Sequence, residues 1–226
     1  MTMPAFLSSR PIATTEATDA PFTLVPNATF DQVGVAMTFA DGEEIYAQEE
    51  ETDFVYEVQT GAVRASRLLS DGRRQIAGFY YPGDLFGLET GATHRSSAEA
   101  IGATRVLVAK RSALKHYGDA GAQAERAIWR ATGAELERAH EHMMLLARKS
   151  AFERVAGLLA DIAKRQARAW SALPMSRQDM ADHLGLSIET VSRMVTQMQV
   201  EGLVVFDGCR RFRVAAPGRL ALLATV

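Results

Sequence analysis

Short apolar runs separated by turn residues fill the chain between about residues 33 and 110. Several of these runs alternate apolar with polar residues, which is the period of a strand with one buried face. Asp41-Gly42 and Asp71-Gly72 lie between neighbouring runs, and Asp-Gly is a strong hairpin signal. We therefore expect an all-β sandwich or barrel, with strands at 35–39, 43–47, 54–58, 62–69, 74–81 and 104–110.

The pattern becomes helical near residue 112, where a proline-free run rich in Ala, Glu, Arg, Leu and Met continues to Arg168. It predicts a first helix of at least 30 residues and a second from Ala151 to about Arg165. Along the first helix a seam recurs at spacings of three and four, formed by Trp129, Thr132, Leu136, Ala139, Met143 and Leu146. Such a heptad seam packs against another helix, or against the β domain of its own chain.

Two short helices joined by a tight turn are predicted over residues 176–198. Ser176 and Ser187 are suited to cap their starts, and Gly185 allows the positive φ of the turn between them. The buried positions of the first helix would be Met180, Ala181 and Leu184, and those of the second Ile188, Val191, Val195 and Met198. A small residue, a glycine turn and a β-branched contact at these spacings indicate a helix-turn-helix.

With that core face fixed, the outer face of the second helix carries Glu189, Ser192, Arg193 and Thr196. A glutamate can accept from cytosine, and an arginine can bind guanine O6 and N7, so we expect Glu189, Ser192 and Arg193 to contact bases. Downstream, runs at 203–206 and 209–215 flank Asp207-Gly208 and predict a hairpin wing. We expect phosphate contacts from Ser176, Arg177, Ser187, Thr196, Arg210 and Arg211. The alternative is an ordinary solvated helix face.

The charge distribution agrees with a polyanion at the C-terminal end. Residues 148–226 carry 12 lysines and arginines against 7 acidic residues, whereas residues 1–147 carry 13 against 20. No stretch of 18 apolar residues exists and no signal-peptide pattern is visible, so we expect a cytoplasmic protein that does not bind membranes. A cupin-type enzyme would need several histidines in the β region, and only His94 lies between residues 30 and 112.

A β-sandwich, a heptad-bearing helix and a winged helix-turn-helix together resemble the CRP/FNR superfamily of bacterial transcription regulators. The similarity spans about residues 30–220 and is carried by segments 42–64, 71–87 and 176–198. It implies an α+β fold: an N-terminal cyclic-nucleotide-binding-like β jelly roll, a long dimerisation helix and a C-terminal winged helix-turn-helix. The corresponding division is a flexible arm at 1–22, a sensor-like domain at 23–115, the dimerisation helix at 116–149 and the DNA-binding domain at 150–226.

The motif at 189–193, ETVSR, is similar to an FNR-type recognition helix. The resemblance implies a homodimer on a TTGAT-N4-ATCAA palindrome, with Glu189, Ser192 and Arg193 as the readers. It also implies contact between the exposed part of residues 71–87 and RNA polymerase. Two recognition helices one DNA turn apart, about 34 Å, would match such a two-fold site.

Two departures from the superfamily narrow the branch. The single cysteine, Cys209, cannot hold the iron–sulfur cluster of the oxygen sensors. The nucleotide-binding cassette retains Arg95, but Leu88 replaces the acidic residue that would bind the ribose. These features are similar to the FixK-like branch, whose members need no effector or cofactor and regulate oxygen-limitation genes. The alternative is a regulator of the same fold that a small ligand in the β-sandwich switches on.

Three other polar residues have alternative interpretations. Cys209 lies beside Arg210 and Arg211, whose charges favour a thiolate, so it is a candidate redox site; it can equally be incidental. His142 is expected to be solvated. His183 is expected to be exposed or to approach a phosphate.

Overall fold

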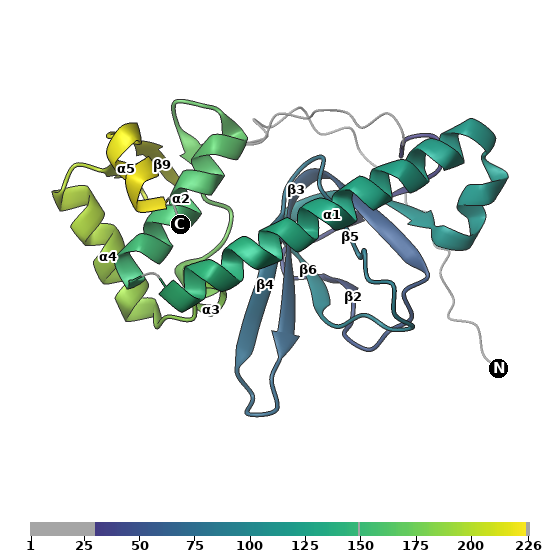
Figure 1. Ribbon diagram of the computed structural model, residues 1–226, viewed down its shortest axis with the longest axis horizontal. Coiled ribbons are helices and arrows are strands. Elements are labelled where there is room, and N and C mark those ends of the chain that lie inside the picture. The colour runs from purple at the N-terminus through teal and green to yellow at the C-terminus, as the bar shows by residue number, and fades with distance from the viewer. Residues whose placement is uncertain (1–29, 149, 225–226) are drawn as a thin grey trace.

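The computed structural model describes residues 30–148 and 150–224, so the arm predicted at 1–22 lies outside the described residues. The N-terminal β domain contains β1 (Val35–Phe39), β2 (Glu44–Tyr46), β3 (Phe54–Leu68), β4 (Arg74–Tyr80), β5 (Leu85–Phe86) and β6 (Ser97–Lys110). A 3₁₀ turn, η1 (Arg111–His116), leads into the long helix α1 (Gly118–Arg148). The C-terminal domain contains α2 (Ala151–Gln166), β7 (Ser171–Ala172), α3 (Arg177–Leu184), α4 (Ile188–Val200), β8 (Val204–Asp207), β9 (Arg211–Val214) and α5 (Pro217–Ala224). Figure 1 shows α1 running along the β domain to the C-terminal domain.

The β domain is one antiparallel sheet with strand order β1-β6-β3-β4, to which β2 adds through β6 and β5 through β3. The runs at 54–58 and 62–69, expected as two strands, form one continuous strand, β3. Its pairing with β6 shifts register on both sides of Thr60. Gly61 makes this irregularity possible: its φ is +82°, and a Cβ there would lie 2.4 Å from Oγ1 of Thr104. The apolar pattern is interrupted by a bulge, therefore, and not by a turn.

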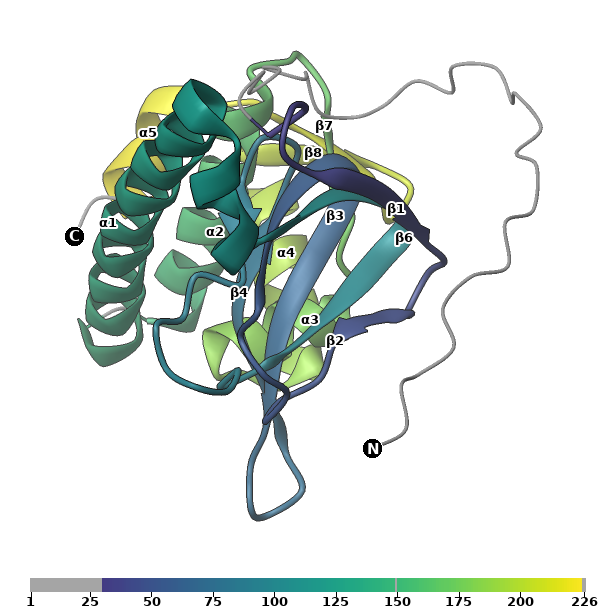
Figure 2. The same ribbon diagram turned by 90° about the vertical axis from the view of Figure 1, so that its right-hand side faces the viewer.

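The two predicted hairpins have different outcomes. Asp71-Gly72 joins β3 to β4 as expected, and this hairpin projects from the domain (Figure 2). Asp41-Gly42 forms a turn, but β1 and β2 each pair with β6 and not with each other, so the predicted hairpin is wrong. The turn is bonded to β6 instead: the Gly42 N–H donates to the Ala100 carbonyl. This pairing could not be predicted, because the first half of β6 is rich in Ala and Gly, which favour strands weakly.

The predicted long helix is confirmed as α1, which has 31 residues. One face of its N-terminal half lies on the β domain, where Ala124 and Ala127 are buried with Phe30 and Leu107. Another face leaves Trp129, Leu136 and Met143 exposed. Across residues 30–148 and 150–224, none of the helices has the length and apolar character needed to span a bilayer.

The C-terminal domain contains the predicted helices and wing, and adds β7 and α5, which the sequence pattern did not predict. Ser150 and Ser176 form capping boxes with Glu153 and Asp179, so each helix start satisfies its own backbone donors. A single apolar cluster joins this domain to the β domain, because Ile76 and Phe79 pack in the same cluster as residues of α2, α3 and α4. The two domains therefore share part of their core. The predicted α+β architecture is confirmed.

Candidate nucleic-acid interface

The helix-turn-helix has the geometry that its sequence predicts. Ser176 accepts a hydrogen bond from the Asp179 N–H at 3.0 Å, and Ser187 accepts from the Thr190 N–H at 3.2 Å. Gly185 follows α3 with φ of +63°, so α4 can begin three residues later. All but one of the predicted core residues are buried. The buried ones are Met180, Ala181, Leu184, Val191, Val195 and Met198.

The exception is Ile188, which was expected on the inner face of α4 but is 38% exposed. Ile188 is the first residue of α4, and helical side chains lean toward the N-terminus of their helix. Its side chain therefore extends past the end of α4, beyond the contact with α3. The spacing predicted the correct face of α4 for Ile188, but it could not show that this face extends beyond the contact with the core.

The outer face of α4 presents the four predicted side chains together. Glu189, Ser192, Arg193 and Thr196 are all exposed. Hydrogen bonds from its own backbone N–H and from the Ser187 side chain lower the pKa of Glu189, so its carboxylate is charged at neutral pH. Thr196 Oγ1 donates to the Ser192 carbonyl at 3.0 Å, which leaves its lone pairs but not its proton available. An acceptor, a hydroxyl and a guanidinium are thus displayed on one surface.

The predicted phosphate-contact residues near α3 have partners within the protein. The Ser176 hydroxyl donates to Asp179 Oδ2 at 2.7 Å and so completes the cap. Arg177 lies over the Phe206 ring at 4.7 Å, and its burial lowers the pKa of its guanidinium. Ser187 is exposed at the start of α4. Of the two serines, Ser187 has the more accessible hydroxyl for a phosphate, although its Oγ lies 3.1 Å from Oγ1 of Thr190.

The wing carries the remaining predicted contacts. Phe206 of β8 and Phe212 of β9 stack at 5.5 Å, with Phe212 buried, and hold the two strands together. Arg211 lies 3.5 Å from Asp207 and also lies over the Trp170 ring. Arg210 donates to the Pro174 carbonyl. Both arginines are exposed. Cys209 is exposed between the two strands, and its redox role stays a prediction.

The predicted dimer seam is partly exposed in the single chain. Trp129, Leu136 and Met143 are 80%, 62% and 56% exposed, which is unusual for such large apolar side chains on one helix. Ala139 is exposed as well. Thr132 donates to the Ile128 carbonyl of its own helix, and Leu146 lies beside Gly185 in the C-terminal domain.

The interior of the β domain holds an aromatic cluster. Tyr46 stacks on His94 with ring centroids 3.7 Å apart, and Phe86 stacks on Tyr56 at 5.1 Å and on Tyr80 at 5.5 Å. Leu88 is 8% exposed in a neighbouring cluster, whereas Arg95 is exposed to solvent. The two residues compared above with a nucleotide-binding cassette therefore lie apart, Leu88 in the core and Arg95 on the surface.

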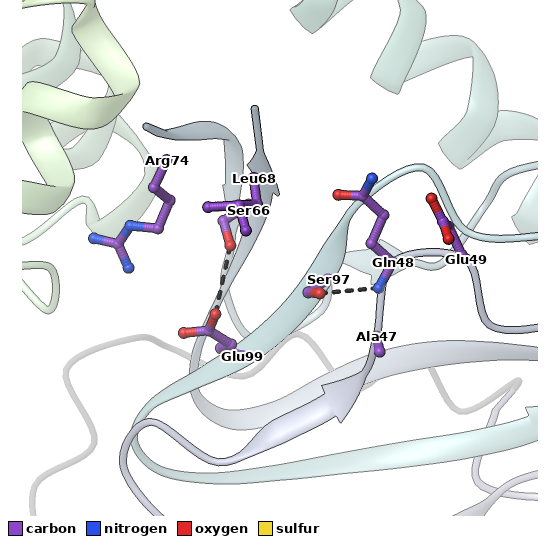
Figure 3. Close-up of a pocket in the computed structure, with 8 residues that line it drawn as sticks. All are labelled: Ala47, Gln48, Glu49, Ser66, Leu68, Arg74, Ser97 and Glu99. Carbon is purple, nitrogen blue, oxygen red and sulfur yellow. Dashed lines mark hydrogen bonds between the residues drawn. The ribbon is translucent and has the colours of Figure 1, made fainter. Parts of the chain in front are cut away.

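A polar groove of about 480 Å³ opens elsewhere on the β domain (Figure 3). Its polar lining comes from Gln48, Glu49, Ser66, Arg74, Ser97 and Glu99. Glu99 is already bonded to Arg64 at 2.9 Å, and Arg74 to two aspartates of α3. Glu99 is thus held by Arg64 of β3, and Arg74 is bonded to the C-terminal domain.

Two histidines lie where the sequence did not predict them. His142 of α1 stacks on His183 of α3 with centroids 4.2 Å apart, so His142 is not simply solvated. His183 Nδ1 lies 3.1 Å from the Ile76 carbonyl. Burial, and then the neighbouring His142, lower the pKa of His183 to about 4, so it is neutral at pH 7. His183 faces the β domain and is not placed to contact a phosphate.

Comparison with known proteins agrees with both parts of the chain. Residues 36–118 match the cyclic nucleotide-binding domain family, and residues 153–223 match the Crp-like helix-turn-helix domain family. The nitrogen fixation regulation protein FixK of Azorhizobium caulinodans is 44% identical over 187 residues, which cover 79% of this chain and 75% of that protein. FixK of Rhizobium meliloti is 41% identical, covering 82% and 85%. The solved structure of FixK2 from Bradyrhizobium japonicum is similar with a TM-score of 0.80 and 46% identity, covering 86% of this chain and 98% of that one.

Proposed function

Because the chain belongs to the CRP/FNR family and is a FixK-type transcription regulator with a helix-turn-helix domain, we propose that it binds TTGAT-N4-ATCAA palindromes as a homodimer without an effector and activates oxygen-limitation genes. Its relatives are transcription regulators, a class without catalytic activity. Because its proposed target is DNA, we also propose that it acts in the cytoplasm.

The single observation that carries the proposal is the outer face of α4. Glu189, Ser192 and Arg193 are exposed together, while Val191, Val195 and Met198 hold the opposite face in the core. The rigid core fixes the direction of the helix, so these three side chains would enter a major groove as a unit. Arginine and glutamate can bind the two bases of the one G·C pair in each half-site.

Homodimer formation is supported by the exposed apolar seam of α1. Trp129, Leu136 and Met143 carry no charge, so two copies could pair without a repulsive term that a signal would have to remove. A two-fold dimer would present two recognition helices to a two-fold palindrome. We propose Trp129, Thr132, Leu136, Ala139, Met143 and Leu146 as the interface.

Binding without an effector is supported by the interior of the β domain. The stacked rings of Tyr46, His94, Phe86 and Tyr56 occupy space there, and Leu88 offers no acceptor to a ribose hydroxyl.

The projecting hairpin, on which Asp71 and Arg73 are exposed, is our proposed contact for RNA polymerase.

A mobility-shift titration tests the proposal directly. Purified protein without additives should bind the palindrome, and Glu189→Ala and Arg193→Ala should each weaken binding by roughly 1–3 kcal/mol. Arg177→Ala should weaken binding to all sequences about equally. Binding that appears only after a small ligand is added would support the alternative, a ligand-gated regulator, for which the groove beside Arg74 is the candidate site. Equal binding to a scrambled duplex would refute sequence-specific recognition.

A further inference from the structure

Arg74, at the start of β4, links the β domain to the first helix of the helix-turn-helix. Its Nη2 atom lies 2.7 Å from Asp179 Oδ1 and 2.8 Å from Asp182 Oδ2, and its Nε donates to Asp182 at 2.9 Å. Figure 3 shows the Arg74 side chain directed away from Ser66 and Glu99, toward the green helices of the C-terminal domain. A single guanidinium thus binds two carboxylates of α3.

The two carboxylates are well placed to respond to that guanidinium. Asp179 and Asp182 side chains are only 4% and 14% exposed, so solvent screens the contacts weakly. Burial alone would raise the pKa of Asp179, but hydrogen bonds from Ser176 and the charges of Arg64 and Arg74 lower it. Asp179 is therefore ionised at neutral pH. It caps α3 and anchors α3 to the β domain at once.

The other end of α3 is fastened to the same strand. Gln75 Nε2 donates to the His183 carbonyl at 3.4 Å, and His183 Nδ1 lies 3.1 Å from the Ile76 carbonyl. His142 of α1 stacks on His183 and adds a contact from the helix that carries the seam. Three consecutive residues, Arg74, Gln75 and Ile76, therefore hold α3 along its length. Helix α4 follows α3 through one tight turn, so it is held as well.

We propose that Arg74 is a positioning residue that fixes the orientation of the helix-turn-helix relative to α1, and so sets the half-site spacing that the dimer accepts. This inference rests on the proposed binding of a palindrome. One base pair added between half-sites moves them about 3.4 Å further apart and rotates one by about 35°. A domain clamped in one orientation cannot follow that change, whereas a loosely attached domain can.

The test compares Arg74→Ala with Arg73→Ala, a matched control on the same hairpin. Arg73 is 78% exposed and pairs with Asp71 of that hairpin, so its loss leaves α3 untouched. Dissociation constants are measured for palindromes with spacers of three, four and five base pairs. We expect Arg74→Ala to reduce the preference for a spacer of four base pairs by about tenfold. This size is typical of the interaction energy between residues in contact. Arg73→Ala should keep the wild-type preference.

A second measurement needs no DNA. Cys209 is the only cysteine of the chain and is exposed on the wing, so a spin label there reports the wing-to-wing distance in the dimer. The distance distribution by double electron–electron resonance should broaden in Arg74→Ala and stay narrow in Arg73→Ala. Identical distributions and identical spacer preferences in the two variants would overturn the inference. Failure of the wild type to prefer the palindrome over scrambled DNA would overturn the proposed function, while broadening in Arg74→Ala would still support the clamp.

Discussion

Replacing Leu136 with alanine tests whether the exposed seam of α1 is a dimer interface. Leu136 is 62% exposed near the middle of the seam. Alanine favours helix at least as strongly as leucine, so the change removes apolar surface without weakening α1. Any effect then belongs to what covers the seam.

The exposed fraction sets the size of the effect. Complete burial of a leucine side chain contributes about 1.5–3 kcal/mol, and the exposed 62% of Leu136 accounts for about 1–2 kcal/mol of that. A two-fold interface contains the residue twice, so a dimer would lose about 2–4 kcal/mol. The dimer dissociation constant should therefore rise from about 30-fold to several hundredfold.

Sedimentation equilibrium over a range of protein concentrations measures that constant. Glu141→Ala is the matched control, because Glu141 is exposed on the same helix outside the seam. Thermal unfolding at high protein concentration verifies that both variants fold. A Leu136→Ala dimer as tight as the Glu141→Ala dimer would refute the assignment of the seam to the interface.

Two further variants test the interior of each domain. Glu57 is 1% exposed, burial and then the charge of Asp31 raise its pKa to about 7, and its Oε2 atom has no hydrogen-bond partner among residues 30–148 and 150–224. A pKa that is raised in the folded state contributes stability at low pH, and this stability is lost as the pH rises through 7. Glu57→Gln should therefore raise the free energy of unfolding by about 1–3 kcal/mol at pH 8 and by much less at pH 5. An equal gain at both pH values would contradict this. Ser176→Ala should lower the free energy of unfolding by about 1 kcal/mol without DNA, because its hydroxyl caps α3. Unchanged stability with weakened DNA binding would instead assign Ser176 to a phosphate.

The helix-turn-helix could be predicted closely because its signals are local. Caps at Ser176 and Ser187 and a glycine at 185 fix the helix boundaries within a few residues of the chain. The outer face of α4 follows from helical periodicity once the core face is known. The exposure of Ile188 could not be predicted in this way, because it depends on where the core ends.

Contacts between distant segments left no comparable signal. Neither the sequence around Arg74 nor that around Asp179 indicates that they meet, 105 residues apart in the chain. The same holds for His142 and His183, each of which was consistent with an exposed helix position. The pairing of both β1 and β2 with β6 was hidden in a segment of small residues. Tertiary packing decides all three.

The most direct test of the central claim is a protein–DNA double-mutant cycle on Arg193. The wild type and Arg193→Ala are each titrated with the TTGAT palindrome and with a duplex in which the G·C pair of both half-sites is replaced by A·T. The wild type should lose about 1–3 kcal/mol for each replaced pair, whereas Arg193→Ala, which keeps only the Glu189 contact to the cytosine of that pair, should lose clearly less. If Arg193→Ala discriminates between the two duplexes as strongly as the wild type, α4 does not read that base pair through Arg193 and the account is contradicted.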